Sequence, residues 1–142
     1  MPPELLHQRR RRLAAGLPLG DALLLIHAGA PVPLPEGSDQ TYPYRAHAEY
    51  IYAAGEECAG GVVAFDPREA SAGWRTFVPP VTEAESVWEG RRPSAGDSIE
   101  ALPAWLEALP KPVGVFACYD GRAQQVLEAC QLLGLHVPDE VA

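Results

Sequence analysis

The chain has 142 residues, a net charge of −8 at pH 7 and a hydrophobic content of 47%. A chain of this length buries about two-thirds of its unfolded surface as one domain and has no room for a second full domain. The negative charge argues against a nucleic-acid-binding protein, because phosphate binding depends on clustered Lys and Arg. The one basic run, Arg9 to Arg12, is interpreted as a solvated helix face.

Cysteine content and hydropathy indicate the compartment. The three cysteines are odd in number and lack Cys-x-x-Cys spacing, and two of them lie in apolar stretches, as is typical of a reducing environment. No apolar run is long enough to span a bilayer, and the N-terminus lacks a signal-type apolar region. We therefore expect a cytoplasmic protein with neither membrane nor nucleic acid as partner.

The first third of the chain predicts a helix, a strand and a loop. Pro2-Pro3-Glu4 is typical of a helix start, and Gly16 suits the end of that helix. The unbroken apolar run from Ala22 to Ile26 predicts a strand covered on both faces. Residues 28–37 contain three prolines and two glycines and predict an irregular loop.

The middle of the chain predicts three strands and two helices. Strands are expected over residues 50–54 and 61–65, joined as a hairpin, and over residues 74–78, ended by two prolines. Thr82 and Glu85 form a capping-box pattern that predicts a short helix through Trp88. Asp97 and Glu100 repeat this pattern and predict a helix through Leu109.

The last part of the chain predicts one β-α unit. Residues 113–118 form an apolar strand, and a helix follows in which apolar residues recur at helical spacing up to Gly134. Asp120 stands where the strand ends and the helix begins. It is expected either to cap that helix or to face a ligand cleft.

The order of six sequence signals along the chain resembles that in the N-terminal domain of the Xaa-Pro aminopeptidases (aminopeptidase P). This family domain is shaped like the N-terminal domain of creatinase. The resemblance covers about residues 7–95 and rests on the basic first helix, the apolar strand, and the segments Asp39–Arg45, Tyr50–Gly55, Phe77–Pro80 and Trp88–Arg92. Ala46 and Ala53-Ala54 depart from the usual family residues. The resemblance implies an α/β fold, with a mixed sheet of about five strands flanked by helices and a C-terminal β-α unit.

The resemblance also implies a role without catalysis. In that family a separate C-terminal domain binds two manganese ions through carboxylates and a histidine. The metal ions generate the attacking hydroxide. The four histidines here are scattered, with no His-Glu-x-x-His and no Gly-x-Ser-x-Gly motif, so we expect no catalytic residue, metal or cofactor in this chain and no activity from it alone. The implied partners are the catalytic domain or sister subunits, and weak homo-oligomers are expected.

Five residues are candidates for an interface or for substrate access. Trp88, Arg91 and Arg92 belong to a segment that in the family approaches the active-site mouth of a neighbouring subunit. A half-buried Trp88 that anchors a short helix is the preferred alternative. Tyr44 and Arg45 lie in the turn before the aromatic segment, where stacking of Tyr44 on Pro43 and an ion pair of Arg45 with Asp39 or Glu49 are the structural alternatives.

Residues 109–142 have a resemblance of their own, to part of the sugar-binding domain of xylose-responsive transcription regulators. In those domains an Asp at the position of Asp120 faces the sugar. We therefore divide the chain into residues 1–108 and residues 109–142, packed on the same domain. The alternatives to the peptidase reading are a sugar-sensing regulator fragment and a chimeric or truncated product without its own activity.

Overall fold

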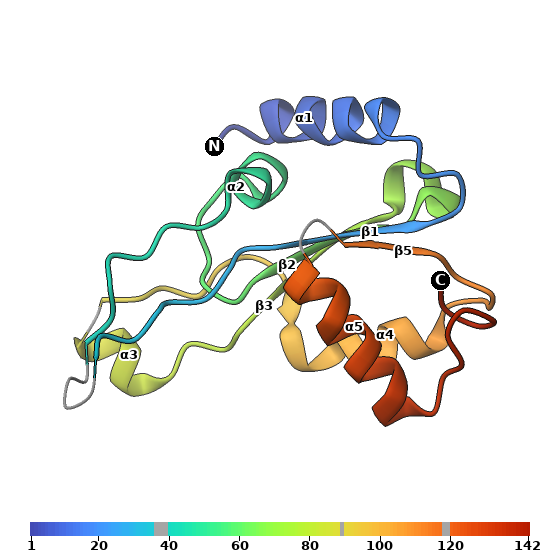
Figure 1. The fold of residues 1–142 in the computed structure, drawn as a ribbon. Helices are drawn as coiled ribbons and strands as arrows, with labels where there is room; N and C mark the ends of the chain where they lie inside the picture. Colours follow the sequence, from blue (N-terminus) through green and yellow to red (C-terminus); the bar gives the residue numbers. More distant parts are fainter. Residues whose placement is uncertain (36–39, 89, 118–119) are drawn as a thin grey trace.

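A five-stranded mixed sheet lies between two layers of helices in the computed structural model, which describes residues 1–35, 40–88, 90–117 and 120–142 (Figure 1). The strands are β1 (Leu23–His27), β2 (Val62–Phe65), β3 (Trp74–Val78), β4 (Asp97–Ser98) and β5 (Val115–Ala117). Their order in the sheet is β4-β3-β2-β1-β5. The predicted α/β class with about five strands is confirmed.

The central strands pair antiparallel and the outer strands pair parallel. Leu24 of β1 faces Phe65 of β2, and β2 in turn pairs antiparallel with β3. The edge strands β4 and β5 run parallel to β3 and β1, with Leu23 opposite Val115. The strands expected over residues 22–26, 61–65, 74–78 and 113–118 therefore exist, to within a few residues at their ends.

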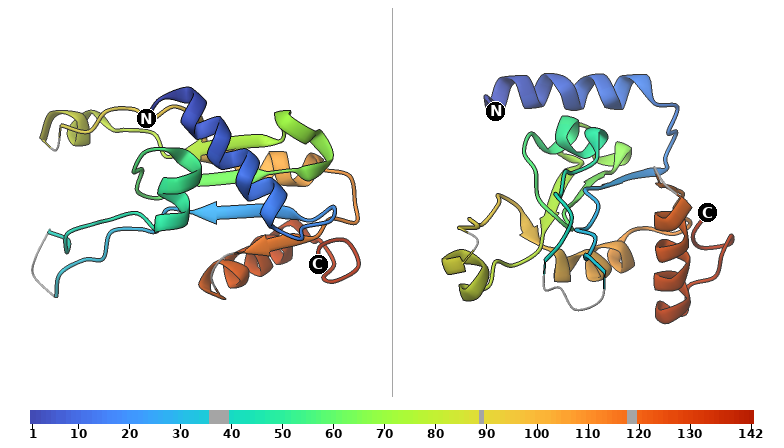
Figure 2. Two further views of the ribbon diagram at one scale, coloured as in Figure 1. Left: turned by 90° about the horizontal axis from the view of Figure 1, so that it is seen from above. Right: turned by 60° about the vertical axis from the view of Figure 1, so that its left-hand side comes forward.

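Helices cover both faces of the sheet. The helices are α1 (Pro3–Gly16), α2 (Ala48–Ala54), α3 (Glu83–Trp88), α4 (Leu102–Ala108) and α5 (Asp120–Leu133), with 3-10 helices η1 (Pro67–Ala72) and η2 (Ile99–Ala101). Both views in Figure 2 place α1 and α2 on one side of the sheet, with α4 and α5 on the other. Within the described residues, no helix is both long and apolar enough to cross a membrane.

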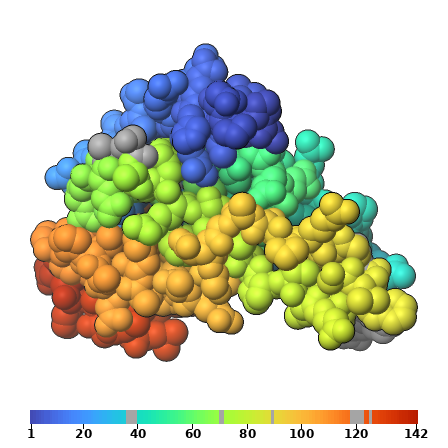
Figure 3. All heavy atoms as spheres, turned by 180° about the vertical axis from the view of Figure 1, so that it is seen from behind, coloured from blue at the N-terminus to red at the C-terminus, as the bar shows by residue number. Residues whose placement is uncertain are grey.

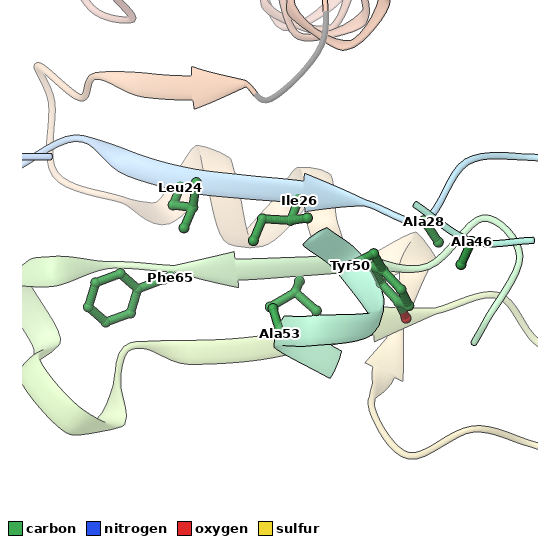
Figure 4. Packing of buried hydrophobic residues seen from close by; sticks show 8 residues of the cluster. Leu24, Ile26, Ala28, Ala46, Tyr50, Ala53 and Phe65 are labelled. Carbon is green, nitrogen blue, oxygen red and sulfur yellow. The ribbon is translucent and has the colours of Figure 1, made fainter. Parts of the chain in front are cut away.

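The alternation of side chains along β1 builds two cores. Leu24 and Ile26 pack with Tyr50 and Ala53 of α2 on one face, and all four are buried (Figure 4). On the other face, Leu23 packs against the elements around α4 and α5, in a cluster with Leu109, Val113, Cys130 and Val141. The strand predicted to be covered on both faces is thus confirmed.

The aromatic strand predicted over residues 50–54 is wrong, because this segment is the helix α2. Tyr50 and Ala53 are its buried residues, and their spacing of three places both on one helical face. Gly55 ends the helix with a φ of 85°, a left-handed conformation that glycine adopts without strain. The predicted hairpin is absent as a result, and β2 pairs with β1 and β3 instead.

The helix predicted from Asp97 begins later than expected. Asp97 and Ser98 form β4, which extends the sheet beside β3. The Ser98 side chain accepts a hydrogen bond from the Glu100 N–H and so caps η2, and Pro103 occupies the first turn of α4. The capping role therefore belongs to Ser98 rather than to Asp97.

Two of the four arginines of α1 do not point to water, which corrects the interpretation of the basic run as a solvated face. Arg10 donates from Nε to the Ala53 carbonyl at 2.9 Å and from Nη2 to Thr76 Oγ1 at 3.1 Å. Its guanidinium lies 5.3 Å from the centre of the Trp74 ring, and that of Arg9 lies 5.0 Å from the Tyr52 ring. Arg10 therefore joins α1 to α2 and to β3.

The buried carboxylate of Asp66 stabilises the connection from β2 to β3. Asp66 is 2% exposed and accepts hydrogen bonds from the backbone and the guanidinium of Arg68, which lower the pKa of Asp66 below its usual value. Arg68 Nη1 also donates to the Pro110 carbonyl at 3.3 Å. This pair therefore connects η1 to the segment between α4 and β5.

We expect Arg10→Met to lower the free energy of unfolding by about 1.5–3 kcal/mol, because it leaves the buried Ala53 carbonyl without its charged donor while keeping the apolar stem. Arg11→Met is the matched control, since Arg11 is exposed on the same helix and should change stability by less than about 0.5 kcal/mol. Urea unfolding of the three proteins measures the difference. Equal effects of the two substitutions would contradict the proposed role of Arg10.

Candidate functional site

Three segments meet at one end of the molecule, beyond the ends of β1, β2 and β3 (Figure 1). They are the long loop from β1 to α2, the short loop from α2 to β2, and the segment around α3 between β3 and β4. In the space-filling view the segment around α3, in yellow-green and yellow, projects from the body of the molecule (Figure 3). A pocket of about 250 Å³ lies among them, lined by Tyr44, Glu57, Cys58, Ala59, Pro79, Pro80, Val81, Arg91, Arg92 and Ser94.

Tyr44 forms one wall of this pocket. Its hydroxyl donates to the Ala28 carbonyl at 2.9 Å, which fastens the end of the long loop to the residue that follows β1. Burial raises the pKa of the Tyr44 phenol above its ordinary value, so the hydroxyl stays protonated and can keep donating. Tyr44 is therefore held in place by a backbone contact.

Arg91 is held by the capping box of α3. Glu85 accepts hydrogen bonds from the Thr82 N–H and hydroxyl, both at 2.8 Å, and Thr82 Oγ1 accepts from the Glu85 N–H at 3.2 Å. The other carboxylate oxygen of Glu85 accepts from Arg91 Nη1. Hydrogen bonds from Thr82, with a smaller effect from Arg91, lower the pKa of Glu85. The predicted capping box is confirmed, and its carboxylate also positions an arginine of the pocket.

Arg45 and Arg92 are less constrained. Arg45 lies 3.9 Å from Glu57, and the Arg45 side chain is largely exposed whereas that of Glu57 is about half exposed. Glu57 is an acid that the sequence did not single out, whereas Asp39, one of the two expected partners, lies outside the described residues. Arg92 is exposed and lines the pocket. An exposed ion pair of this kind contributes little to stability.

Trp88 stands out on the surface. Its side chain is 85% exposed at the end of α3, next to Val87, which is 68% exposed. The half-buried anchor expected for Trp88 is therefore wrong, because α3 has no buried residue and lies away from both cores. Single exposed apolar residues are common, but an exposed tryptophan beside a second apolar residue is a feature of contact surfaces.

The sequence missed several residues beneath the pocket. Tyr50 is fully buried, and a Cβ at Gly61 would clash with its hydroxyl, so Gly61 is needed where β2 begins. Cys58 lies beside this hydroxyl and lines the pocket. The sequence predicts only a hairpin connection over Glu56 to Gly60. In the structure Glu57, Cys58 and Ala59 line the same pocket as Tyr44 and Arg91.

Metal ligands do not gather in the part of the chain that the structure describes, where no three His, Cys, Asp or Glu side chains form a group able to hold an ion. Cys130 is a free, buried thiol, as expected of a core cysteine. Cys118 and the side chain of Asp120 lie outside the described residues, although the backbone of Asp120 begins α5. The two roles expected of Asp120, capping the helix or facing a ligand cleft, stay predictions.

Two family models match the chain. The aminopeptidase P N-terminal domain matches residues 6–104, and the periplasmic binding protein-like domain matches residues 68–142. The first range contains all six motifs recognised in the sequence, and the second contains the C-terminal β-α unit. No curated protein matches the chain.

Solved structures of aminopeptidases share the fold. Aminopeptidase P from Escherichia coli in its low-pH form is 18% identical, with a TM-score of 0.70 over 94% of this chain and 33% of that chain. Proline aminopeptidase P II from Yersinia pestis is 17% identical, with a TM-score of 0.68, over 94% of this chain and 34% of that one. Pseudomonas aeruginosa aminopeptidase PepP is 17% identical, with a TM-score of 0.69, over 100% of this chain and 36% of that chain. The chain thus spans about a third of the length of these proteins.

We expect Thr82→Ala to loosen α3 without unfolding the rest of the protein. The substitution removes the cap that Thr82 gives to the Glu85 N–H, worth about 1 kcal/mol, while α3 has no buried residue to hold it otherwise. Amide hydrogen exchange should become faster in residues 83–88, and the melting temperature should barely change. Ser86→Ala, in the exposed middle of the same helix, is the control and should leave exchange unchanged. Unaltered exchange in Thr82→Ala would rule out this role for the cap.

Proposed function

Because the chain belongs to the aminopeptidase P N-terminal domain family, we propose that it serves a proline-specific (Xaa-Pro) metalloaminopeptidase as the domain that makes subunit contacts and limits access to the active site. The chain corresponds to the N-terminal domain, about a third of the aminopeptidases that share its fold. In this proposal the two manganese ions and the hydrolytic chemistry belong to a catalytic domain. The domain described here acts by contact and not by catalysis.

The exposed Trp88 carries the proposal. A tryptophan held 85% exposed on a short projecting helix exposes a large apolar surface to water, and covering that surface is favourable. Trp88 stands three residues before Arg91 and four before Arg92, which supply positive charge in a protein of net charge −8. An aromatic residue with neighbouring arginines is the composition found at the centre of protein interfaces. The partner in this proposal is a catalytic domain or a sister subunit.

The pocket lined by Tyr44, Arg91 and Arg92 suits a role in controlling substrate access to an active site. Tyr44 and Arg91 are both fixed by hydrogen bonds, whereas Arg45 and Arg92 extend into solvent. A wall fixed by hydrogen bonds, with two exposed cations beside it, can contact the edge of another subunit's active site without closing over it. We therefore assign Trp88 to contact, and Tyr44, Arg45, Arg91 and Arg92 to shaping the approach of substrate.

Three further assignments belong to the same proposal. We place the protein in the cytoplasm, on the basis of its cysteine content. Residues 1–108 are assigned to the aminopeptidase-like domain, with residues 109–142 packed on it. The parallel pairing of β5 with β1, in which Leu25 faces Ala117, supports this packing.

A second candidate function is favoured by one observation. The periplasmic binding protein-like match to residues 68–142 is compatible with a sugar-sensing fragment, in which Asp120 would contact the sugar. The same residues lie within the aminopeptidase fold, which covers 94% or more of the chain. We therefore rank this function second.

We expect the purified chain to self-associate weakly and reversibly through the Trp88 region. Sedimentation velocity over a range of protein concentrations should show a rising weight-average coefficient that Trp88→Ala abolishes. Leu132→Ala is a matched control, because Leu132 is 89% exposed but lies on α5. A monomeric parent protein at every concentration, or association untouched by Trp88→Ala, would refute the contact role.

We expect millimolar xylose to leave the melting temperature unchanged. A ligand that binds only the folded state would raise it by mass action, but the described residues form one sheet domain without the second lobe that encloses a sugar. Differential scanning calorimetry with and without xylose is the measurement. A rise that disappears in Asp120→Ala would instead favour the sugar-sensing function.

A further inference from the structure

A second cavity lies on the opposite face of the sheet from α1 and α2. It occupies about 190 Å³ between the sheet and the helices α4 and α5, which lie below the strands in Figure 1. Its walls come from β1, β2 and β5, from α4 and α5, and from the chain around Val113 and Val141. The segments that enclose it are thus distant in sequence.

The described lining of this cavity is almost entirely apolar. Among the lining residues that the structure describes, none is Asp, Glu, Lys or Arg, and the side chains with polar atoms are those of His27 and Cys130. The Nδ1 atom of His27 accepts a hydrogen bond from the Gly29 N–H at 2.6 Å, so one ring nitrogen is already used by the backbone. Cys130 is a buried free thiol, which behaves as a small apolar group.

This cavity is partly open to the surface and is large for a small domain. Protein cores pack as densely as organic crystals, and voids larger than a water molecule are few. A designed apolar cavity of about 150 Å³ in another protein stays free of water and binds benzene. The cavity described here is larger than that one, and its described lining is apolar except for His27 and Cys130.

Water and charged molecules are poor occupants of such a space. A buried water needs two to four polar partners, and the described lining offers polar side-chain atoms only from His27 and Cys130. A charged ligand would lose its hydration without gaining an opposite charge. Size and chemistry together select a small, uncharged, apolar molecule.

We propose that this cavity is a binding site for a small uncharged apolar molecule, with an aromatic ring the size of benzene as the simplest member of the class. Pro103 of α4 and Leu133 of α5 line it and are also exposed, so the wall reaches the surface between the two helices. A ligand can enter there without unfolding the sheet. The site lies on the other face of the sheet from Tyr50 and is independent of the peptidase role.

Calorimetry with benzene tests the proposal on the full 142-residue chain. At tenfold excess over its dissociation constant, benzene should raise the melting temperature by about 3–6 °C. Ala129→Leu places three more carbons in the wall and should abolish the rise, whereas Ala123→Leu makes the same change at an exposed position of α5 and should preserve it. A rise of equal size in Ala129→Leu would overturn the proposal.

Nuclear magnetic resonance gives a second readout that does not depend on a variant. Bound benzene should show nuclear Overhauser effects to the methyl groups of Val126 and Leu133, which line the cavity from α5. If Ala129→Leu fails to fold, these contacts in the parent protein decide the question. Absence of both the thermal shift and the methyl contacts would show that the cavity binds no such molecule.

Discussion

One partly buried cation, Arg10, holds together the helical layer on which the pocket depends. Arg10 bonds the last turn of α2 through the Ala53 carbonyl, reaches Thr76 of β3 and lies over Trp74. Burial lowers the pKa of Arg10, but a guanidinium remains charged, so its donors must be satisfied. Since Nε reaches α2 and Nη2 reaches β3, α1, α2 and β3 fit together in one arrangement.

The position of α2 in turn fixes the loops at its two ends. Tyr50 and Ala53 pack on the sheet, so the chain must arrive from the long loop that carries Tyr44 and leave toward Cys58. The bond from the Tyr44 hydroxyl to Ala28 returns the loop to the end of β1. The pocket among these loops therefore follows from core packing, even though its own residues contribute little to the core.

Apolar runs and the signals that mark the end of a helix were sufficient to predict several elements. The apolar run of β1, the capping box of Thr82 and Glu85, and the glycine that ends α5 each identified their element. The segment Tyr50-Ile51-Tyr52 predicts a strand, because aromatic and β-branched residues favour strands. It forms a helix instead, in which Tyr50 and Ala53, three residues apart, pack on one face and the left-handed Gly55 ends the helix. The exposure of Trp88 could not be read from its neighbours in sequence, because burial depends on which distant element covers a side chain. The grouping of Tyr44 with Arg91 required the sheet order for the same reason.

The separation of α3 from both cores has an evolutionary consequence. Since α3 has no buried residue, its side chains other than Glu85 of the capping box can be exchanged at almost no cost to the fold. Selection for recognition and selection for folding then act on different residues, with Val87 and Trp88 free to vary while Tyr50 and Leu24 stay constrained. A lineage could acquire a new partner through changes in α3 alone, and the remaining sheet and helices would serve as an unchanged scaffold.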